Sequence, residues 1–416
     1  MKIAKIQARE IFDSRGYPTI ACYLYLDDGF FVASAVPAGK SKGPYEAHEL
    51  RDGGDRFNGQ GISKAIQIIE EIIAPALVGK EPDVVVIDQI LLQLDGTDDK
   101  SKLGANSMLA ASMAVIKAQA VVNEMELYEF IAQLLGYESV MLPIPFFNVI
   151  NGGMHADNKL HIQEFMIVPS GAQNFRQSLE YGVEFYHRLK DILKRKKLLT
   201  CVGDEGGFAP LLTDDRQALD LLMETIQSLK AESLFKIALD AAASFFYNKQ
   251  KKAYEWYGKL ISTQELIELY GQWVQDYPIF SLEDGLVAFD IEGWQTLTAT
   301  LGKKIQILGD DIFATNPTRI YQGIIEGLAT GSIIKPNQIG TITETLQALQ
   351  LCQEHGFNTL VSHRSGETND AFIADLAVGA NAGQIKAGGL SRGERLAKYN
   401  RLLMIEDELA LAMLEN

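Results

Sequence analysis

Three carboxylates at the ends of apolar runs are the first residues whose types and spacing indicate chemistry. Asp240 ends the run in FKIALDA, Glu283 ends IFSLE and Asp310 follows IQILG. A lone buried carboxylate is costly to desolvate, so three of them at the ends of buried runs need a cation. Oxygen ligands without Cys or His beside them suit a hard ion, which indicates Mg²⁺. For any one of the three, capping of a helix at a strand-to-helix turn is the alternative.

Two lysines occupy the equivalent place after later apolar runs. Lys335 follows GSII, and Lys386 ends GQIK. A lysine among apolar residues either pairs with carboxylates or takes part in proton transfer. A lysine with an ordinary pKa of about 10.4 is a poor base near pH 7, but burial and a nearby cation lower that pKa. Structural ion pairs are the alternative interpretation.

The SHRSGET segment (362–368) places His363, Arg364 and Ser365 directly after another apolar run. Imidazole, guanidinium and hydroxyl groups suit phosphate or carboxylate oxygens, so an anionic substrate is indicated, with a solvated loop as the alternative. The chain has 38 Lys and Arg against 54 Asp and Glu, a formal net charge of −16. Such a charge repels nucleic acid and anionic lipid, so we expect no nucleic-acid partner. Local cations must therefore hold an anionic substrate.

Two glycine-rich loops carry further acidic residues. Glu205 lies in GDEGG (203–207), and Gln163 and Glu164 follow NGGMH (151–155). Two glutamates brought together share a proton, which leaves one of them a general acid near pH 7. Each loop alone is weak evidence, because acidic glycine-rich turns are common.

The elements that position these residues are predicted by the spacing of the apolar runs. Successive runs end about one βα unit apart, at Asp240, Glu283, Asp310, Lys335, His363 and Lys386. Runs that are apolar throughout are typical of a parallel sheet covered by helices on both faces. A barrel brings every carboxyl end to one face, whereas an open doubly wound sheet gathers ligands at one switch point. We therefore predict an α/β barrel.

The remaining sequence predicts a second domain and its surroundings. Strand-like alternation followed by helical patterns indicates an α+β cap over residues 1–136, which leaves 137–416 for the barrel. The apolar stretch 103–122 is interrupted by Lys117 and Gln119, so we expect a buried helix and no membrane span. Three cysteines without a CxxC pair favour a reducing compartment, and we expect a cytoplasmic protein.

Ten motifs spread along almost the whole chain together resemble the sequence pattern of the enolase family. They are DSRG (13–16), ELRDG (49–53), NGGMHADN (151–158), QEFMIVP (163–169), VGDEGGFAP (202–210), SLEDG (281–285), GDDIFATNP (309–317), IIKPNQIGT (333–341), SHRSGET (362–368) and AGQIKAGGLSR (382–392). The resemblance implies a modified TIM-type barrel with irregular opening strands, a homodimer or larger homo-oligomer, and Mg²⁺-dependent conversion of 2-phosphoglycerate to phosphoenolpyruvate.

The resemblance also implies a role for each matching residue. Enolase-superfamily sites use a Lys or His base with one or two Mg²⁺ ions. Lys335 would be the base that removes the C2 proton, and Glu205, paired with Glu164, the general acid. One Mg²⁺ occupies a conformational site, and a second arrives with substrate. The implied metal ligands are Asp240, Glu283 and Asp310 for the first ion and Ser41 for the second. The implied substrate contacts are His155, Gln163, His363, Arg364, Ser365 and Lys386.

The mobile lid loop of the cap departs from the family pattern. The family reads Ser-Gly-Ala-Ser-Thr-Gly, whereas residues 38–43 here read AGKSKG, which keeps Ser41 and adds Lys40 and Lys42. We predict that these lysines lie near the substrate phosphate and weaken the second Mg²⁺ site by charge repulsion. The other departures remove no implied catalytic group; they are Tyr17, Phe245, Asn369 and Ala387.

Two alternative functions remain open at this point. One is another superfamily reaction, such as a racemase or an acid dehydratase, which the SHRSGET segment and the Glu164/Glu205 pair argue against. The other is a weakly active or non-catalytic paralogue used for protein binding. The altered lid loop motivates this second alternative, and retention of every implied chemical group opposes it.

Overall fold

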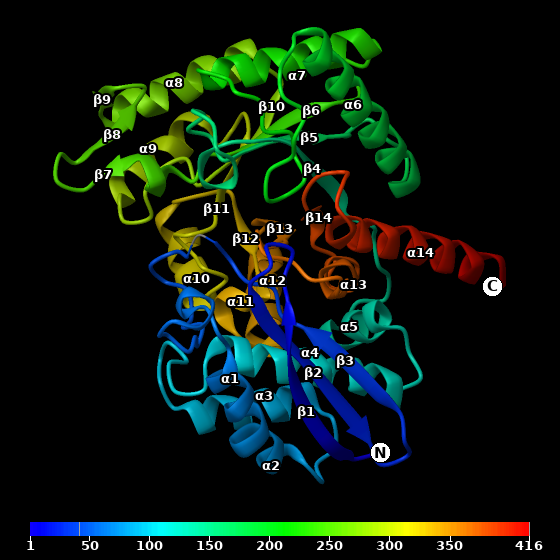
Figure 1. Cartoon of the computed structure of the whole chain (residues 1–416). Helices are drawn as coiled ribbons and strands as arrows, with labels where there is room; N and C mark the ends of the chain where they lie inside the picture. The colour runs from blue at the N-terminus through cyan, green and yellow to red at the C-terminus, as the bar shows by residue number, and fades with distance from the viewer. Residues whose placement is uncertain (41, 416) are drawn as a thin grey trace.

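The structure is a computed structural model that describes residues 1–40 and 42–415, so Ser41 lies outside the described residues. An amino-terminal cap of strands and helices packs against a closed barrel, and the last helix runs along the outside of the barrel (Figure 1). The predicted fold class, an α/β barrel with an α+β cap, is confirmed.

The cap is a three-stranded antiparallel sheet covered by helices. Its strands are β1 (Ile3–Phe12), β2 (Pro18–Leu26) and β3 (Phe31–Ala35). Its helices are α1 (Ser63–Ile68), α2 (Ala74–Leu77), α3 (Val84–Asp95), α4 (Ala105–Val122) and α5 (Leu127–Leu135), with shorter helical turns at Arg56–Gly59 and Ile69–Ile73. By length and composition α4 could cross a membrane, but 78% of it is buried inside the protein, as in a core helix.

The barrel contains eight strands, which close in the order β10-β11-β12-β13-β14-β4-β5-β6. They are β4 (Ile144–Asn151), β5 (Glu164–Val168), β6 (Lys236–Asp240), β10 (Ile279–Glu283), β11 (Gln306–Gly309), β12 (Gly331–Ile334), β13 (Asn358–Ser362) and β14 (Gly383–Lys386). The helices that follow them are α6 (Phe175–Arg195), α7 (Asp215–Leu229), α8 (Thr263–Asp276), α9 (Ile291–Leu301), α10 (Pro317–Glu326), α11 (Pro336–Ile339), α12 (Ile342–Glu354), α13 (Phe372–Gly379) and α14 (Gly393–Glu415). A small side sheet contains β7 (Tyr247–Asn248), β8 (Ala253–Trp256) and β9 (Lys259–Ile261), and short turns lie at Gly153–His155 and Ala243–Phe246.

The parallel sheet predicted from the apolar runs is wrong at one strand, β5, whereas the irregular opening strands implied by the resemblance are confirmed. β5 pairs antiparallel with both β4 and β6, whereas the other neighbouring strands of the barrel are parallel. The run EFMIV is buried at every position, so its pattern reads the same in either direction. The reversal has a consequence for chemistry: Glu164, the first residue of β5, is in register with Asp240, the last residue of β6.

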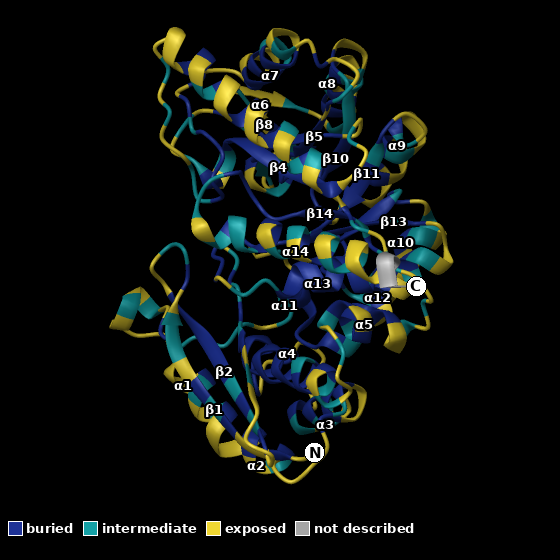
Figure 2. Cartoon of the chain, turned by 90° about the vertical axis from the view of Figure 1, so that its right-hand side faces the viewer, coloured by how far each residue is buried: buried dark blue, intermediate teal, exposed yellow. Residues whose placement is uncertain are grey.

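Apolar side chains fill the interior of the barrel, so its chemistry is confined to one end. Phe146, Met166, Ala238, Leu308 and Leu360 belong to a cluster distinct from the main core. The barrel strands are buried, and exposed residues lie on the outer helices (Figure 2). The polar side chains at the carboxyl ends of the strands therefore lie against a closely packed apolar interior.

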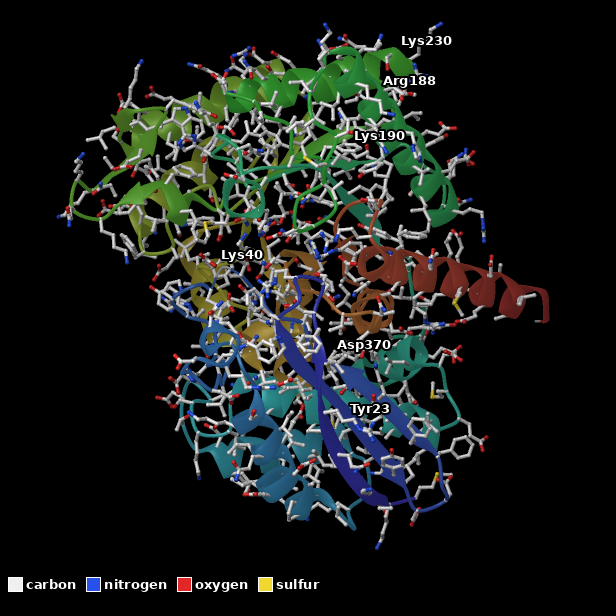
Figure 3. All side chains as sticks on the ribbon, in the orientation of Figure 1. Tyr23, Lys40, Arg188, Lys190, Lys230 and Asp370 are labelled. Atoms are coloured by element: carbon white, nitrogen blue, oxygen red, sulfur yellow. The ribbon has the colours of Figure 1, made fainter. Side chains whose placement is uncertain are left out.

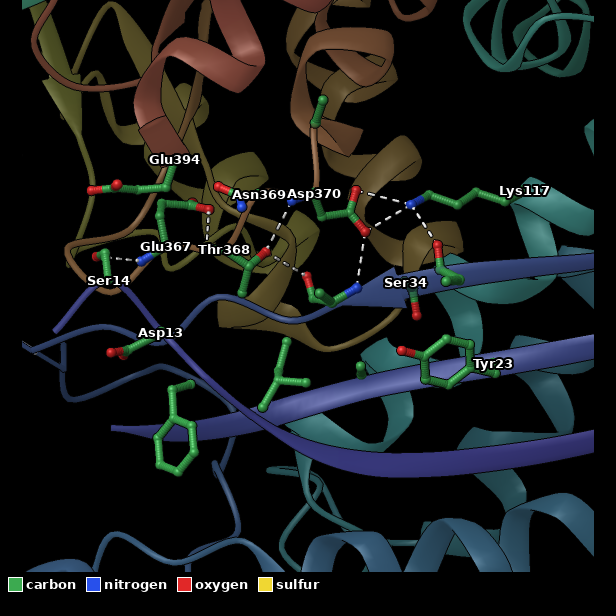
Figure 4. Close-up of a pocket in the computed structure, with 16 residues that line it drawn as sticks. Asp13, Ser14, Tyr23, Ser34, Lys117, Glu367, Thr368, Asn369, Asp370 and Glu394 are labelled. Atoms are coloured by element: carbon green, nitrogen blue, oxygen red, sulfur yellow. Dashed lines mark hydrogen bonds and ion pairs between the residues drawn. The ribbon is translucent and has the colours of Figure 1, made fainter. Parts of the chain in front are cut away.

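A groove of about 650 Å³ lies where the cap sheet meets the barrel (Figure 4). Within it, Lys117 Nζ of α4 contacts Asp370 Oδ2 at 2.7 Å and the Ala33 carbonyl at 2.9 Å. Asp370 also accepts a 2.9 Å hydrogen bond from the Ala35 amide at the end of β3. These bonds fix the base of the lid loop against the barrel.

Candidate active site

One end of the barrel collects most of the predicted residues. Asp240, Glu283 and Lys386 are the last residues of their strands, and the residues directly after β11, β12 and β13 are Asp310, Lys335 and His363. The cavity at this end is lined by His155, Gln163, Glu164, Glu205, Asp240, Ala242, Phe245, Asp284, Asp310, Asp311, Lys335, Ser362, His363, Arg364, Ser365 and Lys386. The residues whose spacing predicts a common barrel end therefore lie together there.

Lys386 lies at the centre of a buried group of carboxylates. Its Nζ is 2.6 Å from Glu283 Oε2, and 3.4 Å from both Asp240 Oδ2 and Glu164 Oε2. Burial alone would lower the pKa of Lys386, but Glu164 and Glu283 raise it well above its usual range. Lys386 is therefore a permanent cation among these side chains.

Lys335 forms a second buried pair, with its Nζ 2.5 Å from Asp310 Oδ2. Burial lowers the pKa of Lys335, Asp310 raises it and Lys386 lowers it, and the net direction is upward. The pKa of Lys335 is thus not lowered as expected by the protein's own side chains, because the charge of Asp310 outweighs that of the Lys386 amine. Gln338 Nε2 donates to the other oxygen of Asp310 at 2.8 Å.

The donor set of this cavity fits a hard divalent cation. Described carboxylates of Glu164, Glu205, Asp240, Asp284, Asp310 and Asp311 line it, together with the cations Lys335, Lys386 and Arg364. Burial and then the charge of Asp240 raise the pKa of Glu283 to about 8, so an added cation would stabilise the ionised form of this carboxyl group. The Oε1 atom of Gln163 is buried and has no hydrogen-bond partner among the residues that the structure describes. An additional cation with oxygen ligands would satisfy both features.

The cavity offers two compact groups of ligand atoms. Within the described part of the chain, ligand atoms lie within 4.8 Å of one another in two groups, which are His155, Glu164 and Glu205, and Asp284, Asp310 and Asp311. The predicted metal ligands share only Asp310 with the second group, since Asp240 and Glu283 contact Lys386 instead. Asp284, which the sequence analysis did not single out, accepts hydrogen bonds from the Asp310 and Asp311 amides at 2.8 and 2.9 Å.

The two glutamates from the glycine-rich loops meet beside the histidines. Glu205 Oε2 lies 3.4 Å from His155 Nδ1 and 3.6 Å from His363 Nε2, and accepts a 3.0 Å hydrogen bond from Asn148. Burial and then Glu205 raise the pKa of Glu164 well above its usual range. Burial would also raise the pKa of Glu205, but His155 and His363 lower it well below its usual range. The opposite directions of these two pKa shifts favour a proton on Glu164 over one on Glu205.

Arg395 of α14 organises this wall of the site, although no motif in the sequence singles it out. Its side chain is fully buried, and Nη1 lies 2.6 Å from His363 Nδ1 and 2.7 Å from the Arg364 carbonyl. Nη2 donates to the Ser365 and Asp204 carbonyls at 2.7 and 3.0 Å. Because Arg395 is a donor, His363 Nδ1 accepts and its proton lies on Nε2, facing Glu205. Burial lowers the pKa of His363 well below its usual range.

The cap completes the site from above through Glu46 and the lid loop. Both oxygens of Glu46 accept hydrogen bonds from Arg364 at 3.0 Å. No motif in the sequence identifies Glu46 as a site residue. The Lys40 amide donates to Ser365 Oγ at 2.7 Å. The space open to water in the cavity is about 20 Å³, enough for about one water molecule. Little open space therefore remains between the side chains as they lie in this structure.

Each lid lysine contacts a carboxylate. Lys40 Nζ lies 3.0 Å from Asp204 Oδ2, and Lys42 Nζ lies 2.6 Å from Glu49 Oε2. The predicted proximity of these lysines to a substrate phosphate stays a prediction. Ser41 between them lies outside the described residues, and so does the predicted second-metal contact.

Comparison with known families assigns both parts of the chain. The family described as enolase, C-terminal TIM barrel domain, matches residues 139–414. The enolase N-terminal domain matches residues 3–131. The chain belongs to the enolase family. Membership confirms the resemblance read from the motifs, and indicates a lyase of the enolase superfamily that requires a metal and acts on a phosphorylated substrate.

Proposed function

We propose that this enolase-family chain catalyses the reversible, Mg²⁺-dependent dehydration of 2-phospho-D-glycerate to phosphoenolpyruvate, in glycolysis and gluconeogenesis. The observation that carries the proposal is the convergence, on one buried cavity, of Lys335 with the carboxyl groups of Glu164 and Glu205, whose pKa values are shifted in opposite directions. An amine base and a carboxylic acid in one cavity are the two groups that removal of a C–H proton and departure of a hydroxyl require.

In the proposed reaction, Lys335 Nζ accepts the C2 proton, and Glu205 gives a proton to the C3 hydroxyl, which leaves as water. Glu164 supplies the proton to Glu205 across the shared pair. Lys335 must first be neutral, and a metal ion held by Asp310 would weaken the contact that raises the pKa of this lysine. Mg²⁺, when bound, supplies positive charge that stabilises the negative charge left on the substrate when C2 loses its proton.

The remaining side chains would bind and orient the substrate. We assign Asp240, Glu283 and Asp310 to the first Mg²⁺, and Ser41 to a second Mg²⁺ that arrives with substrate. Lys386 would contact the substrate carboxylate. The other proposed contacts are His155, Gln163, His363, Arg364 and Ser365.

The test is the ultraviolet absorbance of phosphoenolpyruvate formed from 2-phosphoglycerate, with Mg²⁺ or with a chelator. We expect formation only with Mg²⁺, and a loss of about 10²- to 10⁴-fold for Lys335→Met, the contribution typical of a positioned general base. Lys236→Met, at the opposite end of β6, is the matched control and should keep wild-type turnover. Absence of product from the wild type would contradict the proposal. Exchange of the C2 proton without elimination would favour another superfamily reaction, and no exchange would favour the binding paralogue.

We also propose a cytoplasmic homodimer or larger homo-oligomer with a cap of residues 1–136 and a barrel of residues 137–416. Sedimentation of the purified chain would measure the assembly. A monomer at micromolar concentration would contradict that part of the proposal.

A further inference from the structure

Lys40 reaches from the cap to two different loops of the barrel. Its Nζ donates to the Met154 carbonyl at 2.7 Å and to Asp204 Oδ2 at 3.0 Å. Figure 3 shows Lys40 between the cap and the barrel. Each acceptor belongs to the residue directly before one of the two side chains that face each other in the cavity: His155 follows Met154, and Glu205 follows Asp204.

The two barrel loops are themselves connected at this point. The Asp204 amide donates to the His155 carbonyl at 3.1 Å, and His155 Nδ1 lies 3.4 Å from Glu205 Oε2. A single ammonium that contacts both chain segments therefore restrains the relative position of the imidazole and the carboxylate.

The lid is held to the barrel on the side of Lys40. Ala38 and Gly366 exchange two backbone hydrogen bonds of 2.8 and 2.9 Å, and the Lys40 amide contacts Ser365 Oγ. The Lys40 side chain is 40% exposed and Asp204 is 31% exposed, so the ion pair is screened and adds little to global stability. Its effect is local, on the geometry of the two loops.

We propose that Lys40 is a positioning residue for the step in which the C3 hydroxyl is protonated and leaves. Lys40 holds the loops of His155 and Glu205 in register when the lid loop contacts the barrel. This inference rests on the proposed function. Lys335 follows β12, and its amine contacts Asp310 rather than either loop. Loss of Lys40 therefore impairs departure of the C3 hydroxyl, which takes its proton from Glu205, more than transfer of the C2 proton to Lys335 Nζ.

The experiment compares two rates in Lys40→Met: incorporation of solvent deuterium at C2 of 2-phosphoglycerate, and formation of phosphoenolpyruvate. We expect product formation to fall about 10-fold or more, because small misplacement of a catalytic group costs up to about 10²-fold. Deuterium incorporation should change far less, and Lys40→Arg should restore most of the product formation. Equal losses of both rates, or no loss of either, would overturn the proposal.

Lys42→Met is the matched control, since Lys42 lies in the same loop and pairs with Glu49 but contacts neither barrel loop. Its ratio of exchange to product formation should stay that of the wild type.

A second readout does not depend on turnover. Amide hydrogen exchange of segments 152–160 and 202–207, without substrate, should be faster in Lys40→Met than in Lys42→Met and the wild type. Equal exchange in all three would overturn the proposal. If the wild type forms no phosphoenolpyruvate but Lys40→Met loosens these segments, the proposed function fails while the positioning contact stands.

Discussion

Replacement of Arg395 by lysine tests whether a buried arginine of α14 organises the histidine wall of the site. The guanidinium makes four hydrogen bonds of 2.6 to 3.0 Å, to His363 Nδ1 and to the carbonyls of Arg364, Ser365 and Asp204. A fifth contact, to Ser14 Oγ, is longer at 3.4 Å. Lysine keeps the charge but has three donors on one atom, so at least two of these acceptors lose their partner.

The cost follows from the number of lost bonds. A buried hydrogen bond to a charged group contributes about 1.5–3 kcal/mol, so two losses should lower the free energy of unfolding by about 3–6 kcal/mol. His363 is then free to turn away from Glu205. We expect kcat/KM for phosphoenolpyruvate formation to fall by about 10- to 100-fold, because the imidazole is no longer fixed.

The assay combines urea denaturation with steady-state kinetics at several pH values, for Arg395→Lys and for Arg401→Lys. Arg401 lies on the same helix and pairs with Asp375, Glu126 and Glu408, away from the cavity. The control should lose stability with little change in kcat/KM. A variant of Arg395 that loses stability but keeps wild-type kcat/KM would refute the positioning role, and so would one that changes neither quantity.

Two further predictions concern the cap. Burial raises the pKa of Asp88, which accepts a 2.8 Å hydrogen bond from the Thr343 amide of α12, from 3.8 to about 6. The stability tied to its protonated form is therefore full below pH 4 and lost as the pH rises through about 6. The free energy of unfolding of Asp88→Asn, relative to that of the wild type, should therefore rise by up to about 3 kcal/mol between pH 4 and pH 8. A difference in urea denaturation that does not change with pH would contradict this. The double variant Lys40→Ala, Lys42→Thr should lower the Mg²⁺ concentration for half-maximal activity by about threefold, since it removes two positive charges that Asp204 and Glu49 only partly neutralise. An unchanged dependence of activity on Mg²⁺ concentration would contradict the charge-repulsion hypothesis.

The sequence predicts the barrel and much of the site because both depend on local pattern. An apolar run that ends in Asp, Glu or Lys predicts both a buried strand and a candidate site residue at its end, as at Asp240, Glu283 and Lys386. The direction of β5 is not encoded in this way, since a uniformly buried strand has the same pattern whether it is parallel or antiparallel.

Contacts between distant segments are also invisible in local pattern. Arg395 reads as a surface arginine in an amphipathic helix, and only the fold shows that it is fully buried behind His363. Glu46 and Lys40 belong to a loop without periodicity, and their partners lie more than a hundred residues away. Such pairings depend on how the cap docks, which no single stretch of sequence specifies.

The most direct test of the account is the position of Mn²⁺, used in place of Mg²⁺, in anomalous diffraction from crystals of the full chain. We predict a peak ligated by Asp240, Glu283 and Asp310, with the Lys335 amine facing it and Lys386 moved off Glu283. A peak held by Asp284 and Asp311 without Asp240 and Glu283, or no peak at this end of the barrel, would contradict the assignment of the metal site.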